Sequence, residues 1–165
     1  MKQMNMFSDT TLAESNQWTL FVDGASRNNP GPSGAGICIV KNNNVFITCG
    51  YYLGIKTNNQ AEYLALLLGL CVLNEHIISG DQVRIVSDSQ LLVRQLLGMY
   101  KVRHPNLQTL YAVCKQKINA LNAVISHVLR EENSHADAMA NEGVDNKIFP
   151  PKHYLAQLKS YGIEL

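Results

Sequence analysis

The fold is decided by the stretch from Trp18 to Gly36, which reads WTLFVDGASRNNPGPSGAG. Its opening residues are aromatic, apolar or β-branched, which is typical of a strand. The pair Asp23-Gly24 and the Asn, Pro and Gly residues after it are typical of turns. We therefore expect a strand over 18–22, followed by a long irregular connection that ends at Gly36.

Downstream of this stretch, the apolar pattern predicts a strand hairpin and then alternating helices and strands. The hairpin pairs Ile37–Val40 with Val45–Thr48 across an Asn-rich turn. The later elements are expected in this order: a helix after Thr57–Asn59, a strand over 83–86, helices over 91–97 and 106–121, a strand over 124–129, a helix over 133–142 capped by Asn133, and a short amphipathic helix around 154–159. This order is typical of an α/β domain with a five-stranded mixed sheet flanked by helices.

Length and composition indicate one compact domain. The chain has 165 residues, of which 46% are hydrophobic, enough to form a core. We expect a flexible leader over 1–16, the domain over 17–145, and a tail over 146–165 that packs on the domain. The low charged fraction of 16% and the net charge of +1 exclude a disordered polyelectrolyte and a protein that is basic all over. Any surface that binds nucleic acid must therefore be local.

The chain shows no signal peptide and no apolar run long enough to span a membrane. We therefore expect a soluble, cytoplasmic and monomeric protein. The four cysteines form no C-x-x-C pair and have mostly apolar neighbours, so they are interpreted as reduced thiols of the core: Cys38, Cys49, Cys71 and Cys114.

Four acidic residues stand at the boundaries of the predicted elements: Asp23, Glu62, Asp88 and Asp137. Each has a structural explanation when taken alone. Asp23 suits a turn, Glu62 follows Asn59 at the interval of a capping box, and Asp88 can cap the next helix. Asp137 is favoured by the dipole at the start of the last helix.

Taken together, the four acids indicate a metal site, because the ends of neighbouring strands meet at one edge of a sheet. Two carboxylates about 4 Å apart repel each other by roughly 4 kcal/mol at an effective dielectric constant near 20, so such a cluster needs a cation. Ligation by oxygen alone favours Mg²⁺ or Mn²⁺ over Zn²⁺, and Mg²⁺ also recruits phosphate oxygens. The pattern therefore favours phosphoryl-transfer chemistry.

The segments around these acids resemble type 1 ribonuclease H, of the ribonuclease H-like superfamily. The matching segments are Phe21–Ser26 with Asn29–Pro32, Thr57–Glu62, Ser87–Gln90, and Arg130–Asn133 leading to Asp137. Each segment carries one acid, and the resemblance extends over residues 18–144. It implies a ribonuclease H-like fold, in which the second strand is antiparallel to the rest of the sheet.

The resemblance also implies an activity, the hydrolysis of the RNA strand of an RNA/DNA hybrid to 5′-phosphate and 3′-hydroxyl ends. The family's carboxylates fall on Asp23, Glu62, Asp88 and Asp137, which would bind two Mg²⁺ ions, with Mn²⁺ as a substitute. Asp23 would be shared by both ions, Asp137 would hold the ion that activates water, and Glu62 and Asp88 would hold the ion at the leaving oxygen. No protein partner can be inferred.

Contacts to the hybrid are implied for a set of short polar side chains: Asn29, Thr57, Asn58, Asn59, Ser89 and Gln90. Such side chains suit 2′-hydroxyls and phosphates in a minor groove, although they can equally serve as turn and helix caps. Lys101 and Arg103 lie between Ser89 and Arg130, a stretch with basic residues but no Asp or Glu. We expect both to meet phosphates, and the alternative is a solvated helix face.

One departure from the better-known members concerns the connection before the last helix. Leu129–Asn133 is too short for their mobile, histidine-bearing loop, and no basic extension lies between the middle helices. The connection resembles the archaeal-type subgroup, in which an arginine assists near the second metal, so Arg130 is assigned a catalytic role. Its alternative is an ion pair with a surface acid such as Glu131 or Glu132. His127 is expected as a strand residue and His135 as an exposed residue at the helix start, and neither is expected to be catalytic.

Two other functions remain open at this point. The domain can be a catalytically weak or inactive module that binds hybrids, or the same fold can act on double-stranded RNA. Retention of all four acids argues against the inactive module, because a domain without catalysis has no need to tolerate their repulsion.

Overall fold

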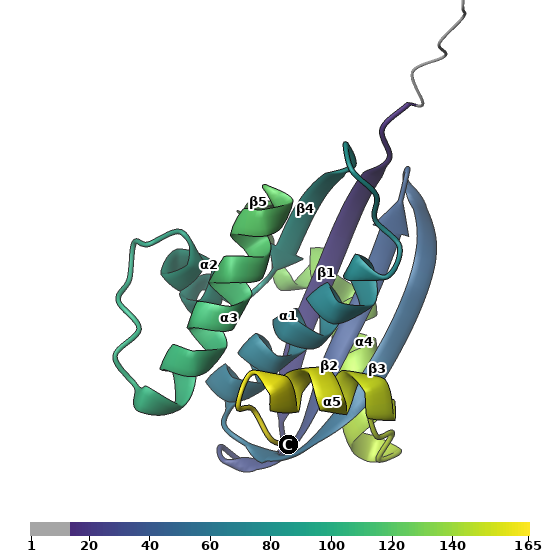
Figure 1. Cartoon of the computed structure of the whole chain (residues 1–165). Coiled ribbons are helices and arrows are strands. Elements are labelled where there is room, and N and C mark those ends of the chain that lie inside the picture. Colours follow the sequence, from purple (N-terminus) through teal and green to yellow (C-terminus); the bar gives the residue numbers. More distant parts are fainter. Residues whose placement is uncertain (1–13) are drawn as a thin grey trace, which may run out of the picture.

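The structure, a computed structural model, describes residues 14–165 and is built around one five-stranded sheet (Figure 1). The expected leader lies mostly outside the described residues, because these begin at Glu14. The strands are β1 (Gln17–Ser26), β2 (Gly31–Lys41), β3 (Asn44–Lys56), β4 (Gln82–Ser87) and β5 (Val124–His127).

The strand order is β3-β2-β1-β4-β5, which places β1 at the centre. β2 pairs antiparallel with both of its neighbours, β1 and β3. β1 pairs parallel with β4, and β4 pairs parallel with β5. Among the strands of residues 14–165, β2 therefore runs against the other four, as predicted.

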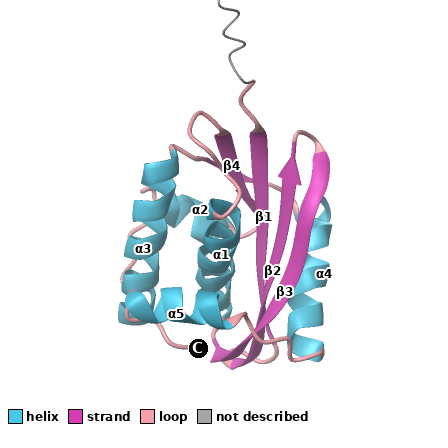
Figure 2. Ribbon diagram, turned by 45° about the vertical axis from the view of Figure 1, so that its right-hand side comes forward, coloured by secondary structure: helices cyan, strands magenta, loops and turns pink. Residues whose placement is uncertain are grey.

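Helices cover both faces of the sheet (Figure 2). They are α1 (Asn58–Asn74), α2 (Gln90–Leu96), α3 (Pro105–Leu121), the 3₁₀ helix η1 (Arg130–Asn133), α4 (Ser134–Asp145) and α5 (Lys152–Ser160). α1 lies on one face with α3 and α5 beyond it, and α4 lies on the opposite face. Nearly every side chain from Tyr63 to Leu73 is buried, because α1 is enclosed between the sheet and the outer helices.

Several predicted strand boundaries are wrong. β3 continues to Lys56, beyond the expected end at Thr48. For β1 and β2 the reason lies in helix packing. The connection expected over 23–36 is mostly strand, since Asp23 pairs with Gly36 in the β1–β2 ladder. Small residues such as glycine have low strand propensity, but here they admit α4. A Cβ atom on Gly36 would lie 1.8 Å from the carbonyl oxygen of Ala136, so no larger residue fits. At one edge of the sheet, β5 ends at His127 and not at the expected residue 129, and residues 130–133 of the connection form η1.

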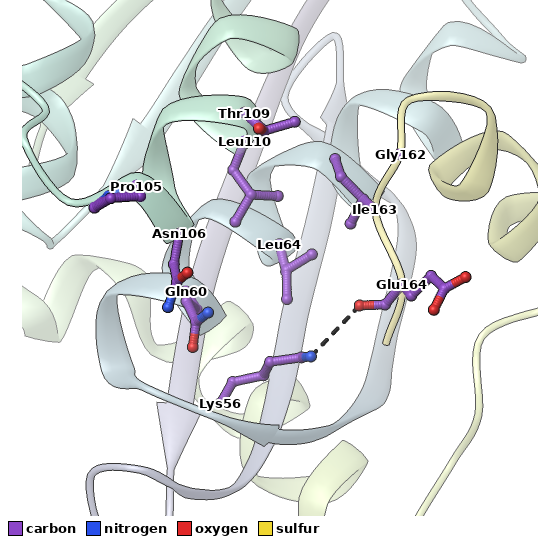
Figure 3. A pocket seen from close by; sticks show the side chains of 10 residues that line it. All are labelled: Lys56, Gln60, Leu64, Pro105, Asn106, Thr109, Leu110, Gly162, Ile163 and Glu164. Carbon is purple, nitrogen blue, oxygen red and sulfur yellow. Dashed lines mark hydrogen bonds between the residues drawn. The ribbon is translucent and has the colours of Figure 1, made fainter.

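The tail packs on the domain through α5. Tyr154 and Leu158 are buried in the core, and the Tyr154 hydroxyl donates to Glu75 at 2.9 Å. At the other end of α1, the Lys56 ammonium donates to the carbonyl oxygen of Glu164 at 3.4 Å beside a hollow of about 330 Å³ (Figure 3). The tail thus spans α1 from its end to its start.

The thiols are free, as predicted for a reduced core. Three of them, Cys38, Cys71 and Cys114, are buried, and Cys49 is half-buried. Within residues 14–165, no helix has the length and hydropathy that a membrane crossing requires.

Candidate active site

Three of the four acids converge where β1 and β4 approach the start of α1. Asp23 lies on β1, Glu62 on α1, and Asp88 directly after β4, and one carboxylate oxygen from each lies within 4.8 Å of the others. Asp137 reaches the same place from the first turn of α4. All four line an open cleft of about 500 Å³.

Gly24 allows Glu62 to reach Asp23. The Glu62 carboxylate accepts a hydrogen bond from the Gly24 backbone N–H at 3.2 Å. A Cβ atom on Gly24 would lie 2.4 Å from the backbone of Ala61 and Glu62, so any side chain would push α1 away from β1. The backbones of β1 and α1 therefore pack so closely that position 24 requires glycine.

The structure contradicts the capping roles considered for two of the acids. Thr57 caps α1, because its hydroxyl accepts from the Gln60 N–H at 3.2 Å while the Gln60 side chain accepts from the Thr57 N–H at 2.9 Å. Ser89 caps α2 by accepting from the Leu92 N–H at 3.2 Å. Neither Glu62 nor Asp88 therefore caps a helix.

Burial and neighbouring carboxylates raise the pKa values of Asp23 and Glu62. Burial raises the pKa of Asp23 to about 8, and the charge of Asp88 and the hydrogen-bonded Asp137 carboxyl act in the same direction. Burial, together with repulsion from Asp23 and Asp88, also raises the pKa of Glu62 well above its ordinary value. The Gly24 N–H opposes both shifts. A divalent cation would replace the retained protons, and an all-oxygen donor set fits a hard ion such as Mg²⁺.

Arg130 stands at the rim of the cleft on η1. Its side chain is 81% exposed, and one guanidinium nitrogen lies 3.7 Å from the Asp137 carboxylate. In the described residues Arg130 pairs with Asp137 and not with Glu131 or Glu132, so the expected alternative of an ion pair with an acid stays open, with a different acid as the partner. A contact of this length between exposed groups is weak, so the guanidinium can still accept another anion.

Some residues expected to contact substrate line the cleft. Asn58, Asn59 and Ser89 belong to its lining, on the side of α1 and α2. The Asn29 side chain accepts from the Asn58 N–H at 3.0 Å, which ties the turn between β1 and β2 to the start of α1. Asn29 therefore has a positioning contact in this structure.

Five of the expected contact residues lie outside the cleft lining: Asn29, Thr57, Gln90, Lys101 and Arg103. Thr57 is the cap of α1, and Gln90 is the exposed first residue of α2. Lys101 and Arg103 are exposed on the segment between α2 and α3, so the alternative of a helix face is wrong for both.

Five residues of the cleft lining were not predicted as site residues from the sequence: Gly24, Ala25 and Ser26 on β1, and Arg27 and Asn141. The Arg27 guanidinium donates to the Asn141 side chain at 2.8 Å and to Asp145 at 2.9 Å. The Asn141 amide donates in turn to the carbonyl oxygen of Asp137 at 2.8 Å. The available signal was the four-residue spacing of Asp137, Asn141 and Asp145, which places them along one side of a helix.

Two further side chains hold the acid-bearing segments in place. Asn133 is expected to cap α4 but makes no cap bond; it is buried and donates to the Val22 carbonyl at 2.9 Å, next to Asp23. The His127 ring lies 3.2 Å from the Asp88 carbonyl oxygen at the end of β5, an exposed strand position as predicted. His135 is exposed at the start of α4, also as predicted.

Comparison with known proteins identifies the family. The family model described as "Reverse transcriptase-like" matches residues 21–143. Ribonuclease HI of Halobacterium salinarum is 35% identical over 128 residues, which cover 76% of this chain and 63% of that protein. This chain thus spans less than two thirds of the length of the archaeal relative.

Two further relatives match this chain over nearly their whole length. Ribonuclease H of Coxiella burnetii is 32% identical over 80% of this chain and 92% of its own length. The crystal structure of LC11-RNase H1 in complex with RNA/DNA hybrid superposes with a TM-score of 0.75 at 35% identity, over 78% of this chain and 97% of that one. On these matches, the chain belongs to the type 1 ribonuclease H family.

Proposed function

We propose that the protein is a metal-dependent endoribonuclease that hydrolyses the RNA strand of RNA/DNA hybrids to 5′-phosphate and 3′-hydroxyl ends. The observation that carries the proposal is the convergence of Asp23, Glu62, Asp88 and Asp137 on one open cleft in a chain of this family. The hybrid bound to LC11-RNase H1, at 35% identity, supports the choice of substrate.

The carboxylates would hold two Mg²⁺ ions, for which Mn²⁺ can substitute. Asp23 is central among the acids and would be shared, with Asp137 completing one site and Glu62 and Asp88 the other. When bound, the ions supply an activated water and a positive charge at the leaving 3′-oxygen. The protein contributes the rigid placement of the four carboxylates, because each comes from a different, well-packed element.

Polar groups around the acids would orient the hybrid. Asn58, Asn59 and Ser89 offer amide and hydroxyl groups to 2′-hydroxyls and phosphates. Arg130 would present a fixed positive charge to the developing anion above Asp137. Lys101 and Arg103, which are exposed beyond α2, would meet phosphates farther along the duplex. Since every group comes from one chain, we propose that a monomer suffices.

The test compares labelled RNA/DNA, RNA/RNA and DNA/DNA duplexes, each with Mg²⁺, with Mn²⁺ and with a chelator. We expect cleavage of the RNA strand of the hybrid only, with either metal and not with the chelator, and product ends that carry 5′-phosphate. The Asp23→Asn variant is the control for contaminating nuclease. Cutting of RNA/RNA at the same rate as the hybrid would contradict the proposal.

A further inference from the structure

We infer that Arg27 is a substrate contact of its own, which binds a backbone phosphate of the hybrid on the Asp137 side of the cleft. Arg27 lies outside the segments that resemble the family, and it is not one of the four acids. The inference rests on the proposed function, because it names one of the groups that would hold the hybrid.

The position of Arg27 is fixed by α4. The residue follows β1 directly and lies in the short turn before β2. One guanidinium nitrogen donates to the Asn141 side chain at 2.8 Å, and the other terminal nitrogen donates to Asp145 at 2.9 Å. A long flexible side chain is thereby held in one orientation, so little conformational entropy remains to be lost when it binds a ligand.

The Arg27 guanidinium retains capacity for an anion. It carries five N–H donors, and the two contacts with α4 occupy two of them. The side chain is 42% exposed and lines the cleft, so the remaining donors are accessible. A planar guanidinium matches the oxygens of a phosphate better than an ammonium does, and a nucleic-acid backbone supplies such phosphates.

Asn141 couples this guanidinium to the candidate metal ligands. Its carbonyl oxygen accepts from Arg27, while its amide nitrogen donates to the Asp137 backbone carbonyl at 2.8 Å and lies 3.4 Å from the Asp137 carboxylate. A phosphate held by Arg27 would thus be adjacent to Asp137. Arg130, on η1, lies 3.7 Å from the Asp137 carboxylate.

The alternative role for Arg27 is an exposed ion pair with Asp145, whose side chain is 61% exposed. Such pairs contribute little to stability. They would also leave hybrid binding untouched. The hydrogen bond to neutral Asn141 and the place in the cleft lining distinguish Arg27 from a pair of this kind.

The test measures binding of a fluorescent RNA/DNA hybrid by anisotropy, in chelator to prevent cleavage, over a range of salt concentrations. Arg27→Ala should weaken binding about five- to twentyfold and reduce the slope of log affinity against log salt by about one. The matched control is Arg84→Ala, because Arg84 is also exposed but lies on β4 outside the cleft lining. It should change neither quantity. With Mg²⁺, Arg27→Ala should raise KM and leave kcat nearly unchanged.

Two conservative variants separate the substrate contact from the ion pair. Arg27→Lys keeps the charge but cannot form both α4 contacts and a phosphate contact, so it should keep the salt slope and bind with intermediate affinity. Asp145→Asn keeps a hydrogen-bond acceptor and removes a negative charge, so the hybrid should bind at least as tightly as to the wild type.

Wild-type salt dependence and affinity in Arg27→Ala would overturn the inference while leaving the proposed function intact, provided that the wild type binds and cleaves the hybrid. Weakening of binding in Asp145→Asn equal to that in Arg27→Ala would also overturn it, because the contact between Arg27 and Asp145 would then act by holding the turn in place and not through a phosphate contact of Arg27. If the wild type neither binds nor cleaves the hybrid, the proposed function fails, and the inference fails with it.

Discussion

At the scale of single residues, Asp23 is the side chain on which the site depends most. It lies on the central strand, it is 6% exposed, and the carboxylates of Asp88 and Asp137 are close enough to raise its pKa. The cluster therefore costs stability whenever its members must ionise without a cation. This cost can be measured.

Metal-free stability should fall as pH rises. The pKa of Asp23 is about 8 in the folded protein, against an ordinary value of 3.8. Between these values the unfolded chain loses a proton that the folded chain retains, so the unfolded state gains in stability. In chelator, the thermal midpoint of the wild type should fall from pH 5 to pH 8, with little further loss from this group above that.

Asp23→Asn should flatten this decline, raise the midpoint at pH 8, and abolish cleavage. Its residual slope comes from Glu62, whose pKa is also raised. If the thermal midpoint falls with pH equally in the wild type and in Asp23→Asn, Asp23 is not the cause of the decline. If the variant cleaves at more than about a tenth of the wild-type rate, Asp23 is not a ligand of the metal site.

Arg130 should matter for turnover and not for folding. Its guanidinium touches only the rim of the cleft, so Arg130→Ala should leave the thermal midpoint within about two degrees of the wild type. Loss of a fixed charge near the developing anion should slow single-turnover cleavage by roughly ten- to a thousandfold. Arg130→Lys should recover part of the rate.

His127→Ala is the companion measurement, because the His127 ring contacts the backbone carbonyl of Asp88. We expect it to cut at close to the wild-type rate. If His127→Ala is slow and Arg130→Ala is normal, the roles assigned to this connection are wrong.

At the scale of elements, the approach of α4 to the sheet places Asp137. Gly36 lies beneath the helix, where an added Cβ would meet the Ala136 carbonyl oxygen and the Ala140 N–H at 1.8 and 2.5 Å. These are backbone atoms, so only movement of the whole helix relieves the clash. The position of one carboxylate thus depends on the absence of a side chain on a neighbouring strand.

Gly36→Ala should therefore displace α4, destabilise the protein by about 1–3 kcal/mol, and lower the cleavage rate by more than the unfolded fraction explains. Urea unfolding and single-turnover kinetics measure the two effects. Gly69→Ala is the control, because the three atoms nearest to its methyl group would be side-chain atoms of Leu20 and Val22, at 2.9–3.2 Å, and not backbone atoms. A fully active Gly36→Ala would show that Asp137 tolerates displacement of its helix.

The same packing explains which elements could be predicted. α1 and β4 follow from their apolar residues, because burial imposes a pattern on the sequence. The extensions of β1 and β2 through Asp23–Ser26 and Gly31–Gly36 have no such pattern, since their glycines admit the backbone of neighbouring elements: α1 at Gly24, and α4 at Gly34 and Gly36. Tertiary structure overrides local propensity here.

The residues of the candidate site also divide into those that the sequence predicts and those that it does not. Recognisable segments carry the four acids, whose convergence was expected from the topology. The contact of Arg27 with Asn141 depends on how far α4 extends beside the turn between β1 and β2, which no local pattern encodes. Similarly, Thr57 and Asn59 are both good cap residues, and only the extended backbone of Thr57, with φ −78° and ψ 162°, decides between them.

At the scale of the whole molecule, the tail supports the fold from outside the matched family region, which ends at residue 143. It buries Tyr154, Leu158 and Ile163 and is anchored to Glu75 and Lys56 at the two ends of α1. No residue of the cleft lining comes from it. The tail therefore contributes to the stability of the fold and not to the lining of the cleft.

Removal of residues 147–165 should lower the free energy of unfolding by several kcal/mol, since each buried side chain contributes roughly 1.5–3 kcal/mol. At about 15 °C, where enough protein remains folded, the shortened chain should cleave at nearly the wild-type rate. Urea unfolding and low-temperature kinetics test this pair of expectations. Loss of cleavage with unchanged stability would instead place the tail in the substrate path.

The four carboxylates come from β1, α1, the end of β4 and α4, so the ribosome synthesises them one after another. The ribosome delivers Asp23 early and Asp137 more than a hundred residues later. A nascent chain that has not yet released α4 lacks one carboxylate and leaves the glycine-bearing face of the sheet uncovered. The proposed nuclease therefore stays inactive until α4 has left the ribosome and packed on the sheet.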